Sequence, residues 1–173
     1  ELRRRDGLSL LAQRGDGQAV ADRKGNRRRV NAFGLRFHHL GLAVRRPRDA
    51  TQFLEGLGYR VGDAVFDPAQ NVNLIMCSHP GAMPDVEIIY PAAGKSPVDA
   101  LVAARPEGIV YHLCYATADL QAALAALDDA GLRAICKSPP TPAALFGGRR
   151  VSFYDIVGMG LCEIVEDHGP TAA

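Results

Sequence analysis

Residues 39–60 read HLGLAVRRPRDATQFLEGLGYR, and residues 112–133 read HLCYATADLQAALAALDDAGLR. The two stretches align without a gap, and seven of their 22 positions are identical. Each begins with an apolar run typical of a strand and continues with apolar residues at helical spacing. Each then reaches a glycine, Gly58 or Gly131, the residue that best adopts the left-handed conformation at the end of a helix. This internal repeat predicts two similar modules, whose equivalent residues can converge at a pseudo-two-fold axis.

Three further short runs of β-branched and aromatic residues follow the helical segment in each half and predict three more strands. We therefore expect an α+β fold made of two tandem βαβββ modules. The predicted segments are a basic N-terminal extension (1–36), a first module (37–91), a linker (92–108), a second module (109–167) and a tail (168–173).

The composition argues against several classes of protein. The chain has 173 residues and a net charge of +1, but residues 1–35 hold nine Lys or Arg against four Asp or Glu, which leaves a mildly acidic body. Such a body argues against a nucleic-acid-binding core. No apolar run is long enough to cross a bilayer and no secretory signal opens the chain, so we expect a cytoplasmic protein with neither nucleic-acid nor membrane partners. The four cysteines show no metal-binding spacing, and we expect them to be reduced thiols.

Two histidines and two acids occupy matching places in the two halves. His39 and His112 each lie in the first predicted strand of a half, whereas Glu87 and Glu163 each lie between apolar residues in the last. A carboxylate in such a setting is costly unless it is paired or bound to a metal. The four side chains therefore predict one shared site for a divalent ion such as Mn, Fe, Co, Ni or Zn. The alternative is a pair of hydrogen-bonded core histidines with two salt-bridged acids.

Four segments resemble the motifs of the vicinal oxygen chelate superfamily, which includes the glyoxalases, and within it those of methylmalonyl-CoA epimerases. These segments are HLGLAV (39–44), VEIIYP (86–91), YHLCY (111–115) and GLCEIV (160–165). The resemblance covers residues 37–167 and implies a cup-shaped mixed sheet around one metal ion, with His39, Glu87, His112 and Glu163 as its ligands.

The resemblance also implies a metal-dependent isomerase, epimerase or lyase that acts on a small carbonyl compound or acyl thioester through a metal-stabilised enolate. Glu163 is then a catalytic base as well as a ligand. The second acid of the resembled epimerases is replaced here by Ala69, and Asp67, two residues away, could substitute for it only if the loop is rearranged. The alternatives are a dioxygenase of the same superfamily, or a protein that binds or sequesters a small molecule without catalysis.

The Pro- and Gly-rich stretch 138–150 is predicted to be a loop that closes over the substrate, as similar loops do in the resembled family. Phe146 would cap the pocket, and Arg149 or Arg150 would bind a carboxylate or phosphate; the alternative is a turn with solvated arginines. Strand alternation places His38 on the face opposite His39, at the surface or behind the metal ligands. One chain suffices for one site, although exposed sheet edges would also permit a homodimer.

Overall fold

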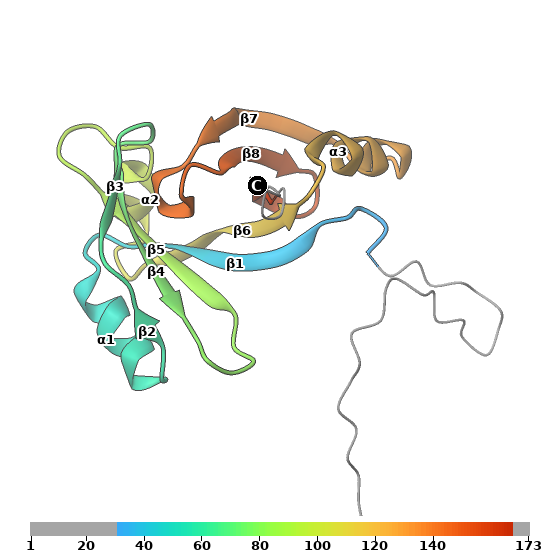
Figure 1. The fold of residues 1–173 in the computed structure, drawn as a ribbon. Coiled ribbons are helices and arrows are strands. Elements are labelled where there is room, and N and C mark those ends of the chain that lie inside the picture. Colours follow the sequence, from blue (N-terminus) through green and yellow to red (C-terminus); the bar gives the residue numbers. More distant parts are fainter. Residues whose placement is uncertain (1–30, 168–173) are drawn as a thin grey trace, which may run out of the picture. The chain divides into compact units, whose positions relative to one another are not determined.

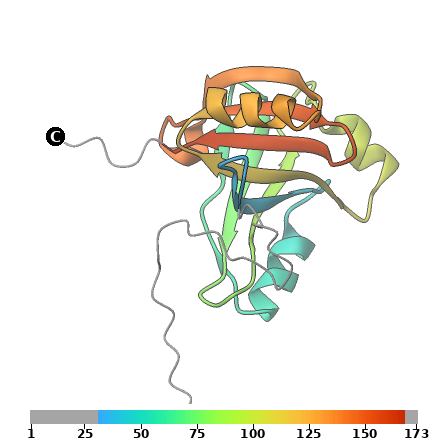
Figure 2. The same cartoon turned by 90° about the vertical axis from the view of Figure 1, so that its right-hand side faces the viewer.

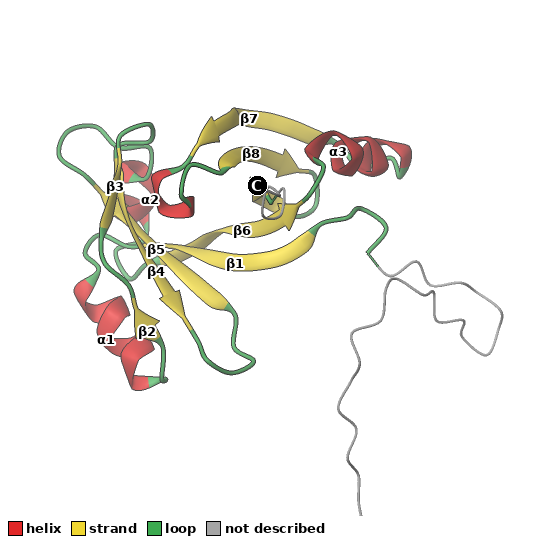
Figure 3. Ribbon diagram, viewed as in Figure 1, coloured by secondary structure: helices red, strands yellow, loops and turns green. Residues whose placement is uncertain are grey.

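The computed structural model describes residues 31–167, and the basic segment 1–30 and the tail 168–173 lie outside the described residues. Within this range, helices are few and strands dominate (Figure 3). The elements in chain order are β1 (Arg36–Ala43), α1 (Arg48–Gly56), β2 (Arg60–Val61), β3 (Val65–Asp67), β4 (Val72–Ser78), β5 (Asp85–Pro91), α2 (Asp99–Ala104), β6 (Ile109–Thr117), α3 (Leu120–Asp129), β7 (Ala134–Pro142), the 3₁₀ turn η1 (Ala144–Phe146), β8 (Arg150–Ile156) and β9 (Gly160–Glu166).

The strands form one mixed sheet in the order β2-β4-β5-β1-β6-β9-β8-β7, with β3 also paired to β4. The two modules join through the antiparallel pair β1 and β6. Each of these strands also runs parallel to the last strand of its own module, β5 or β9. The sheet curls so that β7 and β8 lie across from β1 and β6 (Figure 1). The expected α+β fold of two βαβββ modules in a cup-shaped mixed sheet is confirmed.

Strand alternation divides the sheet into two faces, and the longer helices cover the outer one. Leu54 of α1 packs against Cys77 and Ile88, whereas Leu127 of α3 packs against Cys162 and Ile164. Figure 2 shows α3 running alongside the strands of the second module. The residues next to these in sequence, including Glu87 and Glu163, therefore point to the inner face of the cup.

The local signals for α3 act as expected. The Asp119 side chain accepts a hydrogen bond from the Ala122 amide at 2.9 Å and so caps the helix N-terminus. Gly131 follows the helix with φ of +73°, a conformation that a residue with a side chain rarely adopts. Within residues 31–167, no helix has the length and apolarity that a bilayer crossing requires.

Three elements differ from the expectation. The first strand expected after α1 is broken into the short β2 and β3, both of which pair with β4. The strand β7 runs to Pro142, so the first five residues of the predicted 138–150 loop are strand. Its prolines are tolerated because β7 is an edge strand, paired with β8 alone. The linker also contains the short helix α2, whose Val102 is buried; Val98, just before it, packs with Leu74 and Ile89.

Candidate metal centre

Four adjacent strands at the middle of the sheet each contribute one polar side chain to the inner face. The strands β5, β1, β6 and β9 carry Glu87, His39, His112 and Glu163 in that order. All four residues are at most 3% exposed. The internal repeat thus places one histidine and one carboxylate from each module in a common buried cluster.

The donor atoms of the cluster converge at the separation that one small cation requires. His39 Nε2 lies 3.2 Å from Glu163 Oε2, 3.5 Å from Glu87 Oε2 and 3.4 Å from His112 Nε2. His112 Nε2 lies 3.6 Å from each of the same two carboxylate oxygens. Ligands at roughly 2.1 Å from an ion stand about 3.0–3.4 Å apart when they are neighbours in octahedral or tetrahedral geometry. All four atoms lie within 4.8 Å of one another, so the set fits a divalent ion.

One carboxylate oxygen supports this fit. Glu163 Oε2 is buried and makes no well-aligned hydrogen bond with any residue in the range 31–167, although two imidazole nitrogens lie within 3.6 Å. Burying a carboxylate oxygen without a well-aligned hydrogen bond costs free energy unless a positive charge balances it. Two nitrogen and two oxygen donors suit Mn, Fe, Co, Ni or Zn.

Two small residues make room for the cluster. In the strand ladder, Gly41 lies between Glu87 and His112, whereas Cys114 lies between His39 and Glu163. A Cβ atom added to Gly41 would come within 2.2 Å of the His112 ring. Gly41 and Cys114 occupy equivalent positions of the repeat, two residues after each histidine. Gly41 was not among the predicted site residues, although a glycine inside a strand often marks a close approach.

The electrostatics of the ion-free cluster favour positive charge at its centre. Burial lowers the pKa of His39, but the close carboxylates of Glu163 and Glu87 outweigh burial and raise that pKa to about 9. Burial lowers the pKa of His112 to about 4. Burial also raises the pKa of Glu87. For Glu163, the close approach of His39 and the charge of His112 outweigh burial, so that its pKa falls. Without an ion, a proton on His39 thus balances the carboxylates, and a divalent cation would displace it.

The three predicted substrate-binding residues, Phe146, Arg149 and Arg150, lie in different places relative to the cluster. Phe146 in η1 is 8% exposed, and its ring stacks on His39 with centroids 5.7 Å apart. The Arg149 guanidinium lies 5.5 Å from the centre of the Phe146 ring and pairs with Asp167 at 3.7 Å. Arg150 shares the outer face of β8 with Tyr154 and pairs with Glu166 at 3.6 Å. The structure therefore brings Phe146 and Arg149 to the cluster and turns Arg150 away from it.

A cavity of about 110 Å³ is separated from the cluster by Phe153. Phe153, which contacts the His112 ring at 5.7 Å between centroids, forms one wall, and Asp67, Ala69 and Gln70 form another. Asp67 Oδ1 accepts hydrogen bonds from the Ala69 and Gln70 amides, and Oδ2 accepts one from Gln70 Nε2 at 3.2 Å. Asp67 thus holds the turn that presents Ala69.

A cavity of about 680 Å³ lies elsewhere, on the outer face beside α1, with Arg45, Arg46 and Phe53 in its lining. Size alone would favour this cavity as the functional site. The inner face is the better candidate for the functional site, because the four converging donor atoms lie there. The residues that line the outer cavity form no comparable group of ligand atoms.

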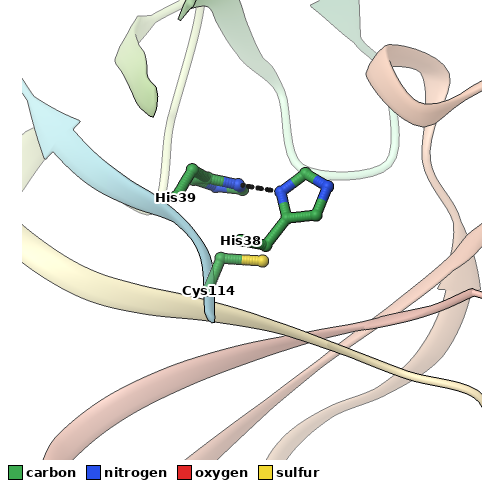
Figure 4. A group of neighbouring side chains, drawn as sticks. All are labelled: His38, His39 and Cys114. Carbon is green, nitrogen blue, oxygen red and sulfur yellow. Dashed lines mark hydrogen bonds between the residues drawn. The ribbon is translucent and has the colours of Figure 1, made fainter. Parts of the chain in front are cut away.

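His38 differs from its predicted position. Simple alternation places it opposite His39, but its Nδ1 lies 2.8 Å from His39 Nδ1 (Figure 4). The reason is an irregularity in β1, where the pairing with β6 skips residue 38. Burial lowers the pKa of His38, as do the charges of His39 and Arg149. Cys114 is fully buried beside these two rings.

Comparison with known proteins places these features in a family. The chain is 29% identical over 106 residues to an ethylmalonyl-CoA/methylmalonyl-CoA epimerase of Cereibacter sphaeroides, a match that covers 61% of this chain and 78% of the relative. A methylmalonyl-CoA epimerase from Streptomyces coelicolor, solved with 2-nitronate-propionyl-CoA, superposes with a TM-score of 0.59 at 26% identity, covering 75% of this chain and 92% of that one. The epimerase from Mycobacterium tuberculosis gives a TM-score of 0.61 at 21% identity, covering 76% and 86%, and so supports the fold.

A family model covers most of the same region. The model of the Glyoxalase/Bleomycin resistance protein/Dioxygenase superfamily matches residues 38–153, a span that contains both histidines of the cluster and Glu87. The matched span includes strands of both βαβββ modules. The chain belongs to the glyoxalase/bleomycin resistance protein/dioxygenase superfamily.

Proposed function

We propose that the protein is a metal-dependent epimerase or isomerase that moves the proton next to the carbonyl group of an acyl thioester. The observation that carries this proposal is the convergence of four buried nitrogen and oxygen donors from His39, Glu87, His112 and Glu163. The similarity to epimerases of methylmalonyl-CoA and ethylmalonyl-CoA supports an acyl thioester over other carbonyl compounds.

The four side chains would hold the ion, which when bound supplies a positive charge that stabilises the negative charge growing on the carbonyl oxygen as the adjacent proton leaves. Glu163 accepts that proton. Its carboxylate suits this role because it has two oxygens, one of which can face the ion while the other remains a base. Cys114 lies beside Glu163 in the strand ladder, and its thiol donates to the Tyr115 carbonyl at 3.8 Å.

Phe146 and Arg149 control access to the cluster. With Phe146 stacked on His39, the ligands are almost fully buried, and the cavity on the other side of Phe153, about 110 Å³, is smaller than a typical ligand pocket. We therefore expect the acyl group to displace Phe146 on binding, and Gly147 and Gly148 directly after it provide the backbone freedom. Arg149, about 38% exposed at its side chain, is available to a substrate carboxylate or phosphate.

Only one protein base is assigned, because Ala69 cannot exchange a proton. The hydrogen bonds of Asp67 to its own turn keep this carboxylate from serving in place of the missing acid. The unaltered chain should therefore remove and return the proton through Glu163, while any inversion at the carbon depends on water or another group.

A dioxygenase reaction is the weaker candidate. Iron sites that activate oxygen use two histidines and one carboxylate and keep positions open for oxygen. Glu87 supplies a second carboxylate at 3.5–3.6 Å from both imidazole nitrogens, which favours the four-ligand set of a proton-transfer site.

The test is hydrogen exchange between substrate and solvent. The protein is freed of metal with a chelator, reloaded with Co²⁺ or Mn²⁺ and incubated with methylmalonyl-CoA in deuterated water, and deuterium at the carbon between the two carbonyl groups is measured by mass spectrometry. We expect incorporation with the loaded protein and almost none with the metal-free protein or with Glu163→Gln.

Glu166→Gln is the matched control, because Glu166 lies on the same strand but pairs with Arg150 on the outer face. It should bind metal and exchange deuterium like the unaltered chain. Metal-independent exchange, or equal exchange by Glu163→Gln, would contradict the proposed chemistry.

A further inference from the structure

The β1–β6 ladder contains two irregularities, one before each histidine of the metal centre. The pairing skips His38 between Phe37 and His39, and it skips Tyr111 between Val110 and His112. His38 and Tyr111 occupy equivalent positions of the internal repeat. Because an extra residue in one strand breaks the alternation of faces, each of them can lie against the histidine that follows it.

The two residues hold their histidines in different ways. His38 Nδ1 lies 2.8 Å from His39 Nδ1, a hydrogen-bonding distance. The Tyr111 ring instead packs against the His112 ring with centroids 4.7 Å apart. His112 Nδ1 is buried and has no hydrogen-bond partner among residues 31–167. A hydrogen bond to the second ring nitrogen therefore exists for His39 and not for His112.

The two nitrogens of His39 face different groups. Nε2 faces the cluster, 3.2 Å from Glu163 and 3.4 Å from His112, whereas Nδ1 faces His38. A neutral imidazole that binds a metal through Nε2 must carry its proton on Nδ1 and donate it to an acceptor. We propose that His38 is this acceptor: it takes the Nδ1 hydrogen bond of His39, fixes the orientation of that ring and keeps the Nε2 lone pair directed at the metal. His38 is thus a positioning residue.

Phe146 supports this arrangement from the other side. Its ring stacks on His39 at 5.7 Å and meets the edge of His38 at 5.6 Å between centroids. Both imidazoles are therefore packed in the orientation that their hydrogen bond requires. If substrate displaces Phe146, the hydrogen bond to His38 still restrains the His39 ring on its Nδ1 side.

A second ion held by His38, His39 and Cys114 is the competing interpretation, because these three offer ligand atoms within 4.8 Å of one another (Figure 4). The distance between the two Nδ1 atoms decides against it. Two nitrogens bound to one zinc ion stand about 3.3 Å apart, whereas these stand at 2.8 Å, where one donates a proton to the other.

The inference rests on the metal centre of the proposed function and is tested by zinc affinity in the full chain. His38→Asn places an amide oxygen where Nδ1 was and keeps the acceptor, whereas His38→Leu removes it at similar size. His79→Leu is the control, because His79 packs on Tyr59 outside the cluster. Competition with a chromophoric chelator should show zinc binding about 10–100-fold weaker in His38→Leu and close to that of the unaltered chain in His38→Asn and His79→Leu.

Nuclear magnetic resonance of the zinc-loaded chain gives a readout whose main result requires neither an activity assay nor a variant. The His39 ring should show a slowly exchanging proton on Nδ1 and zinc on Nε2, and this proton should exchange faster in His38→Leu. An unprotonated Nδ1 on His39 would overturn the inference even if His38→Leu failed to fold.

The other outcomes separate this inference from the proposed function. Equal zinc affinity in His38→Leu, or an affinity in His38→Asn as weak as in His38→Leu, would overturn the positioning role and leave the metal centre standing. Two zinc ions per chain, falling to one in His38→Leu, would overturn it in favour of the second ion. A chain that binds no zinc, cobalt or manganese would overturn both.

Discussion

At the scale of the residue, the metal centre depends on two small residues as well as on the four residues proposed to bind the ion. Gly41 and Cys114 each separate a histidine from a carboxylate in the strand ladder. The position two residues after each histidine therefore faces the cluster, and a large side chain there would occupy the space of the neighbouring ligand.

Gly41→Ala should displace the His112 ring, because the added Cβ atom would lie 2.2 Å from it and Gly41 sits in the ladder between two strands. We expect metal affinity to fall at least about tenfold, as for other disturbed metal ligands. Metal titration by calorimetry measures this change. Gly56→Ala is the control, since a Cβ atom there meets nothing within 4 Å, and it should bind metal normally. Normal affinity in Gly41→Ala would mean that His112 is not a ligand.

His39 predicts how the stability of the metal-free protein depends on pH. Its pKa of about 9 in the fold lies above the ordinary value of 6.5, so its contribution is complete below about pH 6.5 and is lost as the pH rises through 9. The free energy of unfolding should therefore fall between pH 7.5 and 9, by at most about 1.4 kcal/mol per pH unit. Urea unfolding across this range measures the slope.

Bound zinc should remove this slope, because His39 is then deprotonated throughout. A metal-free chain whose stability rises or stays level between pH 7.5 and 9 would show that His39 does not carry the extra proton.

The sequence is a better guide to the four residues that form the cluster than to the side chains that surround them. The repeat and the acids between apolar residues were sufficient to select His39, Glu87, His112 and Glu163. The face predicted for His38 was wrong, because a bulge shifts the register and no local residue signals it, whereas the alternative that it lies behind the metal ligands stays open. Arg149 and Arg150 were indistinguishable in the sequence; they differ because β8 begins at Arg150, which leaves Arg149 in the turn after Phe146.

At the scale of the element, the turn between β3 and β4 bears on the stereochemistry of the reaction. Ala69 in this turn lines the cavity next to Phe153 and His112. An acid at this position would lie across the cavity from β7 and β8 and could exchange a proton on a second face of the substrate.

Ala69→Glu should therefore add inversion to exchange. With a single enantiomer of methylmalonyl-CoA in deuterated water, we expect the unaltered chain to incorporate deuterium mostly with retained configuration and the variant to produce the opposite enantiomer. Chiral analysis of the product measures the ratio. Ala64→Glu, an exposed position outside the cavity, is the control. Equal racemisation by all three proteins would show that inversion does not depend on this turn.

The elements differ in how well the sequence predicts them. The longer helices and the central strands follow from periodicity, because their buried residues recur at regular intervals. The extension of β7 through Pro142 does not, since prolines normally argue against a strand and only an edge position permits them. The short α2 was missed because six residues carry too little periodicity.

At the scale of the whole molecule, duplication explains the site. Each module supplies one histidine from its first strand and one carboxylate from its last, and the antiparallel pair β1 and β6 brings the two halves together. Neither module alone holds more than two of the four donors. The fold could be predicted from the repeat because the same pattern occurs twice, whereas the closure of η1 over the cluster depends on packing between the modules.

The most direct test of this account is an anomalous difference map, recorded at the cobalt absorption edge, from crystals of the cobalt-loaded protein. We predict a single strong peak within about 2.3 Å of His39 Nε2, His112 Nε2 and one oxygen each of Glu87 and Glu163. No peak among these four side chains, or a peak among His38, His39 and Cys114 alone, would contradict it.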